Sequence, residues 1–175
     1  GNGNGLNFGD NDDNKDSYLY WSSELVFGGK GPRREGLKLF AWMQDGKRLL
    51  DNSNDSIHNP RKFDRKRSGV GIKYLKKPFR VSYEYMKGEG MIFVGPDKPM
   101  FDINGPGPGG DGSDGEASGW YLDAGYYIPD SNWEVDVRYD SYNRLEGDNL
   151  EFEFKTTTLG AQYAFNKKTR LTINY

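Results

Sequence analysis

The chain of 175 residues contains no cysteine and a single histidine, His58. Without cysteine there is no disulfide framework, no thiolate metal site and no cysteine nucleophile. One histidine argues against a histidine metal cluster and against a Ser-His catalytic pair. We therefore expect no bound metal, no cofactor and no catalytic residue, and the sequence does not favour an enzyme.

The chain also lacks a long hydrophobic run and a strong net charge. Its longest apolar run is Leu39–Met43, whereas a membrane-spanning helix needs about 20 apolar residues. This excludes a helical membrane protein. The net charge of −2 gives no global attraction to nucleic acid or to an anionic membrane. The mean hydropathy of −0.90 is that of a hydrophilic chain, yet 15% of the residues are aromatic, and this mismatch needs an explanation.

Helical periodicity is nearly absent, and alternation with a period of two dominates. Within 131–140, four apolar residues alternate with four charged ones, which places the two kinds on opposite faces of a strand. The same alternation recurs, strongly or weakly, in 19–27, 37–43, 70–74, 78–86, 119–128, 159–165 and 169–175. The pattern predicts eight strands of about ten residues, close to the length that a tilted strand needs to cross a bilayer.

The connections between these strands alternate in length. Those at 28–35, 75–78, 128–132 and 166–168 are short, and those at 44–67, 87–118 and 141–155 are long and polar. Outer-membrane barrels have short periplasmic turns and long extracellular loops. We therefore expect an all-β fold, specifically an antiparallel transmembrane β-barrel.

The order of the connections predicts an orientation. If the short turns are periplasmic, the first strand runs inward from the outside and Tyr175 ends outside. A complete bacterial barrel normally has both termini on the periplasmic side. We therefore expect residues 1–175 to form a single barrel segment, incomplete at both ends, with no separate domain.

Three segments carry a family resemblance: Ala117–Pro129, Trp133–Tyr142 and Thr158–Tyr175. They resemble the C-terminal part of the phosphate-selective porin O and P family of Gram-negative bacteria. The resemblance implies a sixteen-stranded, usually trimeric, water-filled channel in the outer membrane that passes small hydrophilic solutes or ions, among them anions such as phosphate. The lysine- and arginine-rich phosphate ladder of the best-known members is not recognisable in this sequence.

Alternation assigns eleven charged residues to the face that would line such a channel. The basic ones are Lys38, Lys73, Arg80, Arg138 and Arg170, and the acidic ones are Glu24, Glu84, Asp123, Glu134, Asp136 and Asp140. The two signs are too balanced to predict an ion preference, but opposed charges would orient polar solutes. Alternatively, these charges only pair with neighbours across the strands. Arg80 and Arg138 are the preferred permeation contacts, because each is expected in mid-strand.

A second basic set lies in the predicted long connection at 44–67, and consists of Arg61, Lys62, Arg65, Lys66 and Arg67. A loop folded into the channel would concentrate anions at a constriction. A loop left outside would pair with lipopolysaccharide phosphates or an acidic partner, or would simply be solvated. Phe63 is the only aromatic residue among them, which argues against nucleic acid.

Two acidic segments suggest calcium only superficially. The first holds Asp10, Asp12, Asn14 and Asp16, and the second Asp111, Asp114 and Glu116. In the first, Lys15 replaces the glycine of an EF-hand and Trp21 stands at the position of its bidentate glutamate. Glu134 and Asp136 share a strand face, as the carboxylates of a glycosidase can, but their regular alternation is also that of a wetted barrel wall.

The aromatic residues favour a membrane wall over a sugar-binding surface. The four tryptophans fall in four different predicted strands, whereas sugar platforms would gather on one face. Aromatic residues near strand ends are typical of the girdles at the two membrane interfaces. Two alternatives stay open: a barrel that serves as a scaffold or sleeve for a partner such as an electron carrier, and a soluble β-sandwich that binds carbohydrate.

Overall fold

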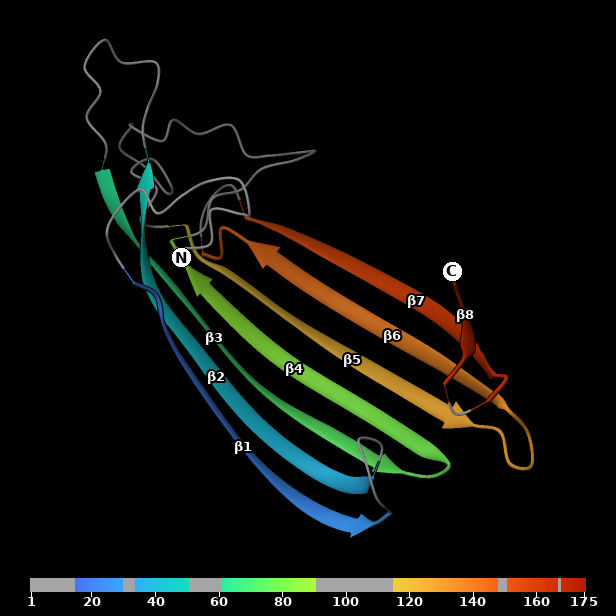
Figure 1. Ribbon diagram of the computed structural model, residues 1–175. Coiled ribbons are helices and arrows are strands. Elements are labelled where there is room, and N and C mark those ends of the chain that lie inside the picture. The colour runs from blue at the N-terminus through green and yellow to red at the C-terminus, as the bar shows by residue number, and fades with distance from the viewer. Residues whose placement is uncertain (1–14, 30–33, 51–60, 91–114, 148–150, 167) are drawn as a thin grey trace.

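The described part of the chain is one antiparallel β-sheet. A computed structural model describes residues 15–29, 34–50, 61–90, 115–147, 151–166 and 168–175. Their eight strands pair in chain order into a single curved sheet (Figure 1). No helix in these ranges is long and apolar enough to span a membrane. The strands are β1 (Ser17–Gly28), β2 (Glu35–Leu50), β3 (Arg61–Lys76), β4 (Phe79–Glu89), β5 (Ala117–Tyr127), β6 (Trp133–Arg144), β7 (Phe152–Ala164) and β8 (Arg170–Asn174).

One register keeps apolar residues opposite apolar residues across the sheet. Ile72 of β3, for example, pairs with Leu39 of β2 and with Tyr83 of β4. Because side chains alternate along each strand, in-register pairing gathers the apolar positions of all eight strands on one face, which we call the apolar face. The eleven charged residues assigned by alternation share the opposite, polar face, whereas the charged pairs at the ends of β2 and β3, such as Asp45 with Lys66, lie on the apolar face. The eight strands and the assignment of the two faces confirm the prediction from alternation.

The burial of these faces is the reverse of that in a water-soluble sheet. Large apolar side chains such as Leu19, Val70 and Leu159 are more than half exposed. Only Phe40, Ala117 and Leu145 are buried apolar residues in the described part, whereas Glu134 and Arg144 are among the buried charged ones. The sheet therefore has no hydrophobic core between two layers.

The short connections gather at one end of the sheet (Figure 1). Their residues explain the tight turns: Asp130 adopts a left-handed conformation at φ 56°, which aspartate tolerates. In the last turn, the Asn166 side chain accepts hydrogen bonds from the backbone N–H groups of Lys168 and Thr169 at 2.8 and 3.0 Å. The predicted alternation of short and long connections is confirmed.

The predicted bounds of two long connections are wrong. Residues 44–50 continue β2 and residues 61–67 belong to β3, which pair with each other from Gln44–Arg67 to Leu50–Arg61. Similarly, β6 continues to Arg144 and β7 begins at Phe152. The prediction assigned these polar residues to loops. Backbone hydrogen bonds nevertheless continue between the strands here, because they do not depend on the polarity of the side chains.

The sheet is not closed. In the described residues, β1 pairs only with β2 and β8 only with β7, so a barrel, which requires closure, is not shown. The β-sandwich alternative requires two packed sheets, and the eight strands instead form one sheet. What is established is therefore an open, all-β, eight-stranded antiparallel sheet.

Two glycines of β3 make room for two aromatic side chains on the polar face. Gly69 lies opposite Trp42 and Gly71 opposite Phe40. A Cβ at Gly71 would lie 2.3 Å from Phe40 Cζ and 2.8 Å from the carbonyl oxygen of Tyr83. The Phe40 ring therefore occupies the space beside Gly71, between Tyr20 and Lys73, which explains why this residue is only 7% exposed in a single-layer sheet.

We predict that Gly71→Ala destabilises the sheet by about 1–3 kcal/mol, the usual cost of overpacking, because the Tyr83 carbonyl cannot move aside as a side-chain tip can. The free energy of unfolding from denaturant titration would measure this. Gly28→Ala is the matched control, since a Cβ at Gly28 meets nothing within 4 Å. Equal stability of the two variants would contradict this packing.

Candidate functional site

The polar face carries all eleven charged residues that alternation assigned to it. One row across the sheet runs through Glu24, Lys38, Lys73, Ser82 and Asp123 and continues into Arg138. These charges come from seven strands, and the register alone brings them together. Their side chains fall into three different environments, which decide what each can do.

The first environment neutralises Arg80 with three carboxylates. Its Nε donates a hydrogen bond to Glu134 Oε1 at 2.8 Å, and Nη1 forms an ion pair with Asp123. Nη2 lies 4.0 Å from Asp136 Oδ2, and the side chains of Arg80 and Glu134 are only 25% and 7% exposed. Arg80 is the second residue of β4 rather than a mid-strand residue, so that part of the expectation is wrong.

Gly125 makes this cluster possible. It lies directly opposite both Arg80 and Asp136 in the sheet. A Cβ at this position would come within 2.9 Å of both Arg80 Nη2 and Glu134 Oε1. The missing side chain thus leaves the space in which the guanidinium crosses from β4 to β6.

The second environment pairs Arg138 within its own strand. Its Nη2 donates to Asp140 Oδ1 at 2.6 Å, and its Nε lies 3.0 Å from each oxygen of the same carboxylate. The guanidinium carbon lies 4.0 Å from the centre of the Tyr121 ring, a cation–π distance. Arg80 therefore pairs with carboxylates across the strands, as the alternative expectation has it, whereas the carboxylate that Arg138 binds lies two residues away on the same strand.

Two further members of the set are held by neutral partners. Glu84 accepts hydrogen bonds from Trp42 Nε1 at 2.8 Å and from the Tyr121 hydroxyl at 3.0 Å. Arg170 donates to Gln162 Oε1 at 3.0 Å. These contacts fix the side chains without neutralising their charges.

The third environment contains Lys38 and Lys73, which are direct cross-strand partners. Like charges directly opposite each other repel, and among the described residues no carboxylate lies within ion-pair distance of either ammonium. Each lies instead over an aromatic ring, Lys38 at 5.5 Å from the Tyr20 centroid and Lys73 at 5.4 Å from that of Phe40. The pair forms a local concentration of positive charge.

Glu24 explains why Lys38 is not neutralised. It lies opposite Lys38 in the sheet, but its carboxylate accepts hydrogen bonds from Arg34, from Nε at 2.8 Å and from Nη2. These hydrogen bonds and the carboxylate charge raise the pKa of Arg34. The connection between β1 and β2 thus supplies the cation that Glu24 binds.

The predicted constriction segment is a strand. Arg65 and Arg67 lie on the polar face and Lys66 on the apolar face, while Arg61 and Lys62 begin β3 with side chains outside the described residues. Arg65 is buried and forms an ion pair with Asp16. Alternation along β3 divides the basic set between two faces, so it does not act as one anion-attracting loop.

The two acidic segments lie largely outside the described residues, as do Asp10, Asp12, Asn14, Asp111, Asp114 and His58. Of the remainder, Asp16 binds Arg65 and Glu116 binds Lys87 Nζ at 2.9 Å. Within the described ranges, no three His, Cys, Asp or Glu side chains gather as a metal site would require.

The sequence did not predict the aromatic side chains of the polar face, such as Phe40, which lies under the ammonium group of Lys73. Phe40 and Trp42 interrupt an otherwise regular alternation, which obscured their face. The available signal was the spacing of Gly69 and Gly71, which lie two residues apart in β3 and opposite the two rings.

Searches against models of protein families, curated proteins and solved structures found no match to this chain.

We predict that Arg80→Gln destabilises the protein by about 3 kcal/mol, since it leaves three partly buried carboxylates without their cation. Arg138→Gln, the matched control, should cost about 1 kcal/mol, because its single carboxylate partner, Asp140, is on the same strand and one third exposed, and the Tyr121 ring adds only a cation–π contact. Denaturant unfolding of both variants measures the difference. Equal destabilisation would mean that the Arg80 cluster is not a cooperative unit.

Proposed function

We propose that this sheet is part of the wall of an outer-membrane porin, a water-filled barrel through which small hydrophilic solutes and ions diffuse passively. The observation that carries the proposal is the continuous apolar face, exposed over eight strands and backed by a charged face. A soluble protein rarely exposes an apolar patch of more than a few hundred Å². Lipid on one side and water on the other satisfy both faces at once.

The strand dimensions support a membrane wall. Apart from β8, the strands have 11–16 residues, and a tilted membrane strand needs about 9–11. The short connections share one end of the sheet, as the periplasmic turns of outer-membrane barrels do.

Aromatic rows on the apolar face give further support. At the end with short connections, Phe79 contacts Tyr126 at 5.4 Å and Trp133 contacts Tyr163 at 4.9 Å, between ring centroids. Further along the strands, Trp120 lies between Tyr83 and Tyr139, at 6.1 and 5.4 Å. The positions between the two rows are mainly aliphatic, as in Val81, Val135, Val137 and Leu159. Aromatic girdles flanking an apolar band are typical of this class.

Small anions are the solutes that the polar face favours locally. Lys38 and Lys73 are adjacent cations with no carboxylate partner among the described residues, whereas Arg80 and Arg138 are already paired. Passing anions would therefore meet the lysine pair as their principal electrostatic attraction on this wall. The resemblance of residues 117–175 to the porin O and P family supports the same class of function, together with a homotrimer in contact with lipid and lipopolysaccharide.

We predict that the full-length protein, reconstituted in planar bilayers, shows stepwise conductance increases typical of open pores. Heat-denatured protein at equal concentration is the control. Insertion without conductance would overturn the channel and favour a scaffold or sleeve. A full-length protein that is soluble without detergent would overturn the membrane assignment itself.

We predict that Lys38→Glu and Lys73→Glu each lower the anion-to-cation permeability ratio by about fivefold. Reversing one charge about 8 Å from an ion in water changes the energies of an anion and a cation by about 1 kcal/mol each, in opposite directions, and screening at about 0.1 M salt reduces the combined effect to about 0.9 kcal/mol. Reversal potentials under a salt gradient measure the ratio. Lys47→Glu is the control, because this exposed lysine lies on the opposite face, 3.9 Å from Asp64. An unchanged anion-to-cation permeability ratio in both Lys38→Glu and Lys73→Glu would refute the role of the lysine pair in attracting anions.

A further inference from the structure

An uncharged row of residues crosses the polar face of the sheet. From β1 to β7, its directly paired members are Tyr20, Trp42, Gly69, Met86, Gly119, Tyr142 and Phe154. We call this row the aromatic belt; the rows on both sides of it contain charged residues. Tyr20 is more than half exposed, and Tyr142 and Phe154 are each more than one third exposed. A face rich in charges thus also presents aromatic rings to the solvent.

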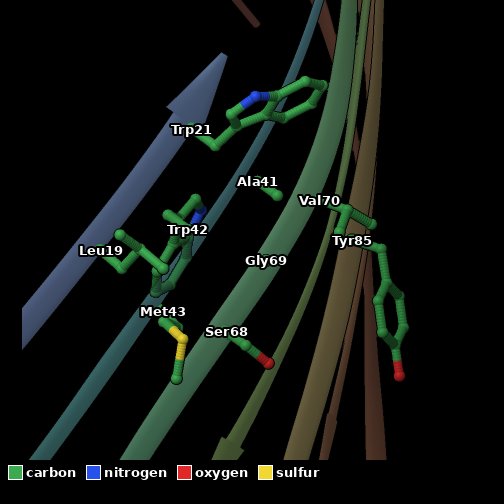
Figure 2. A pocket seen from close by; sticks show the side chains of 9 residues that line it. All are labelled: Leu19, Trp21, Ala41, Trp42, Met43, Ser68, Gly69, Val70 and Tyr85. Atoms are coloured by element: carbon green, nitrogen blue, oxygen red, sulfur yellow. The ribbon is translucent and has the colours of Figure 1, made fainter.

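Trp42 has a fixed place in the aromatic belt. In Figure 2, it lies on β2 beside the bare backbone of Gly69 on β3. A Cβ at Gly69 would lie 2.6 Å from Trp42 Nε1 and 2.7 Å from its Cε2, so the indole occupies the space that a side chain would fill. Its Nε1 also donates a hydrogen bond to Glu84 at 2.8 Å. The indole is therefore held next to Tyr20, its partner on β1.

The ammonium groups of the lysine pair lie beside aromatic rings at the β1 end of the belt. Lys38 Nζ is 5.5 Å from the centroid of Tyr20, and Lys73 Nζ is 5.4 Å from that of Phe40. These two rings stack at 6.3 Å between centroids. An aromatic solute next to Tyr20 would therefore have the ammonium groups within reach of an acidic substituent.

The other side of the belt is also cationic. Arg67 and Arg144 lie in the adjacent row, separated by two small residues, Gly88 and Ala117. Arg67 forms no ion pair among the described residues, and Arg144 lies 5.5 Å from the centroid of Phe154. The belt thus lies between the lysine pair and a row that carries two arginines.

The carboxylates near the lysine pair leave most of this positive charge in place. Those bound by an arginine are Glu24, Asp123 and Asp140. Glu84 forms no ion pair in the described part of the chain, and it accepts hydrogen bonds from Trp42 Nε1 and from the Tyr121 hydroxyl. The unpaired cations therefore outnumber the unpaired carboxylate. The same hydrogen bonds occupy donors that the hydroxyl groups of a stacked sugar would need.

We propose that the aromatic belt and the lysine pair together select aromatic carboxylates, small anions with a flat apolar ring, among the solutes of the channel. The ring stacks beside Tyr20 and Trp42, since aromatic pairs gain free energy beyond the area that they bury. The carboxylate accepts hydrogen bonds from Lys38 and Lys73, which as charged donors make strong ones. The proposal rests on the proposed function, because it requires the polar face to line a channel.

The test is block of the chloride conductance of the full-length protein in planar bilayers. Benzoate should block at concentrations about tenfold lower than acetate, which has the charge without the ring, and than benzyl alcohol, which has the ring without the charge. Trp42→Ala should weaken the benzoate block about tenfold. Trp133→Ala, the same change at an exposed tryptophan of the apolar face, is the matched control and should leave the block unchanged.

Two further variants separate the ring from the charges. Trp42→Phe keeps a ring but loses the hydrogen bond to Glu84, and it should retain most of the benzoate block. A block as weak as that of Trp42→Ala would assign the effect to Glu84 and overturn the stacking role. Lys73→Gln should weaken the benzoate block about threefold, whereas Lys47→Gln, on the apolar face, should not.

The solute comparison also distinguishes the two proposals. Equal block of the wild type by benzoate and acetate, or by benzoate and benzyl alcohol, overturns the selection of aromatic carboxylates, and so does stronger block by glucose. Open channels without a preference for benzoate refute only this selection. A full-length protein that forms no open channel refutes the proposed function itself.

Discussion

The structure depends on one constraint, the antiparallel register of eight strands, which shifts in the β1–β2 ladder between Val26 and Gly28 and is otherwise regular. A slip of a single residue would turn every side chain of a strand to the opposite face. Because neighbouring strands pair residue by residue, most apolar residues gather on one face and the eleven wall charges on the other, with exceptions such as Phe40 and Trp42 on the polar face and Lys66 on the apolar face. The separation of faces is therefore a property of the whole sheet and not of any single strand.

This separation shapes the polar face in detail. A single-layer sheet has no hydrophobic core, so its charged side chains stay near the surface. Whether a charged side chain is neutralised depends on oppositely charged side chains within about one strand spacing. Arg80 reaches three carboxylates because Gly125 leaves the path open. Among the described residues, Lys38 and Lys73 form no ion pair, because Arg34 binds Glu24, the carboxylate that lies opposite Lys38. The same geometry that neutralises one cation thus leaves two others without an ion pair in the described part of the chain.

The sequence was sufficient to predict the strands, their faces and the alternation of connection lengths, because all three follow from periodicity and turn residues. It was not sufficient to predict side-chain partners. Alternation places Arg80 and Lys73 on the same face, but only the register shows that the first has carboxylates beside it and the second has a lysine. The ends of β2 and β3 were misplaced for a related reason: their polar residues obscure a ladder that the backbone maintains.

The scarcity of buried apolar residues has a consequence for stability. Folding in water is driven mainly by removing apolar surface from solvent, yet Phe40, Ala117 and Leu145 are the only buried apolar residues in the described part. In-plane hydrogen bonds alone contribute little net free energy in water, because the unfolded backbone bonds to water equally well. In lipid the balance changes, since an unpaired backbone group has no solvent partner there. A sheet with this distribution of apolar residues would be stabilised by an apolar surrounding, which is what the proposed membrane wall would supply.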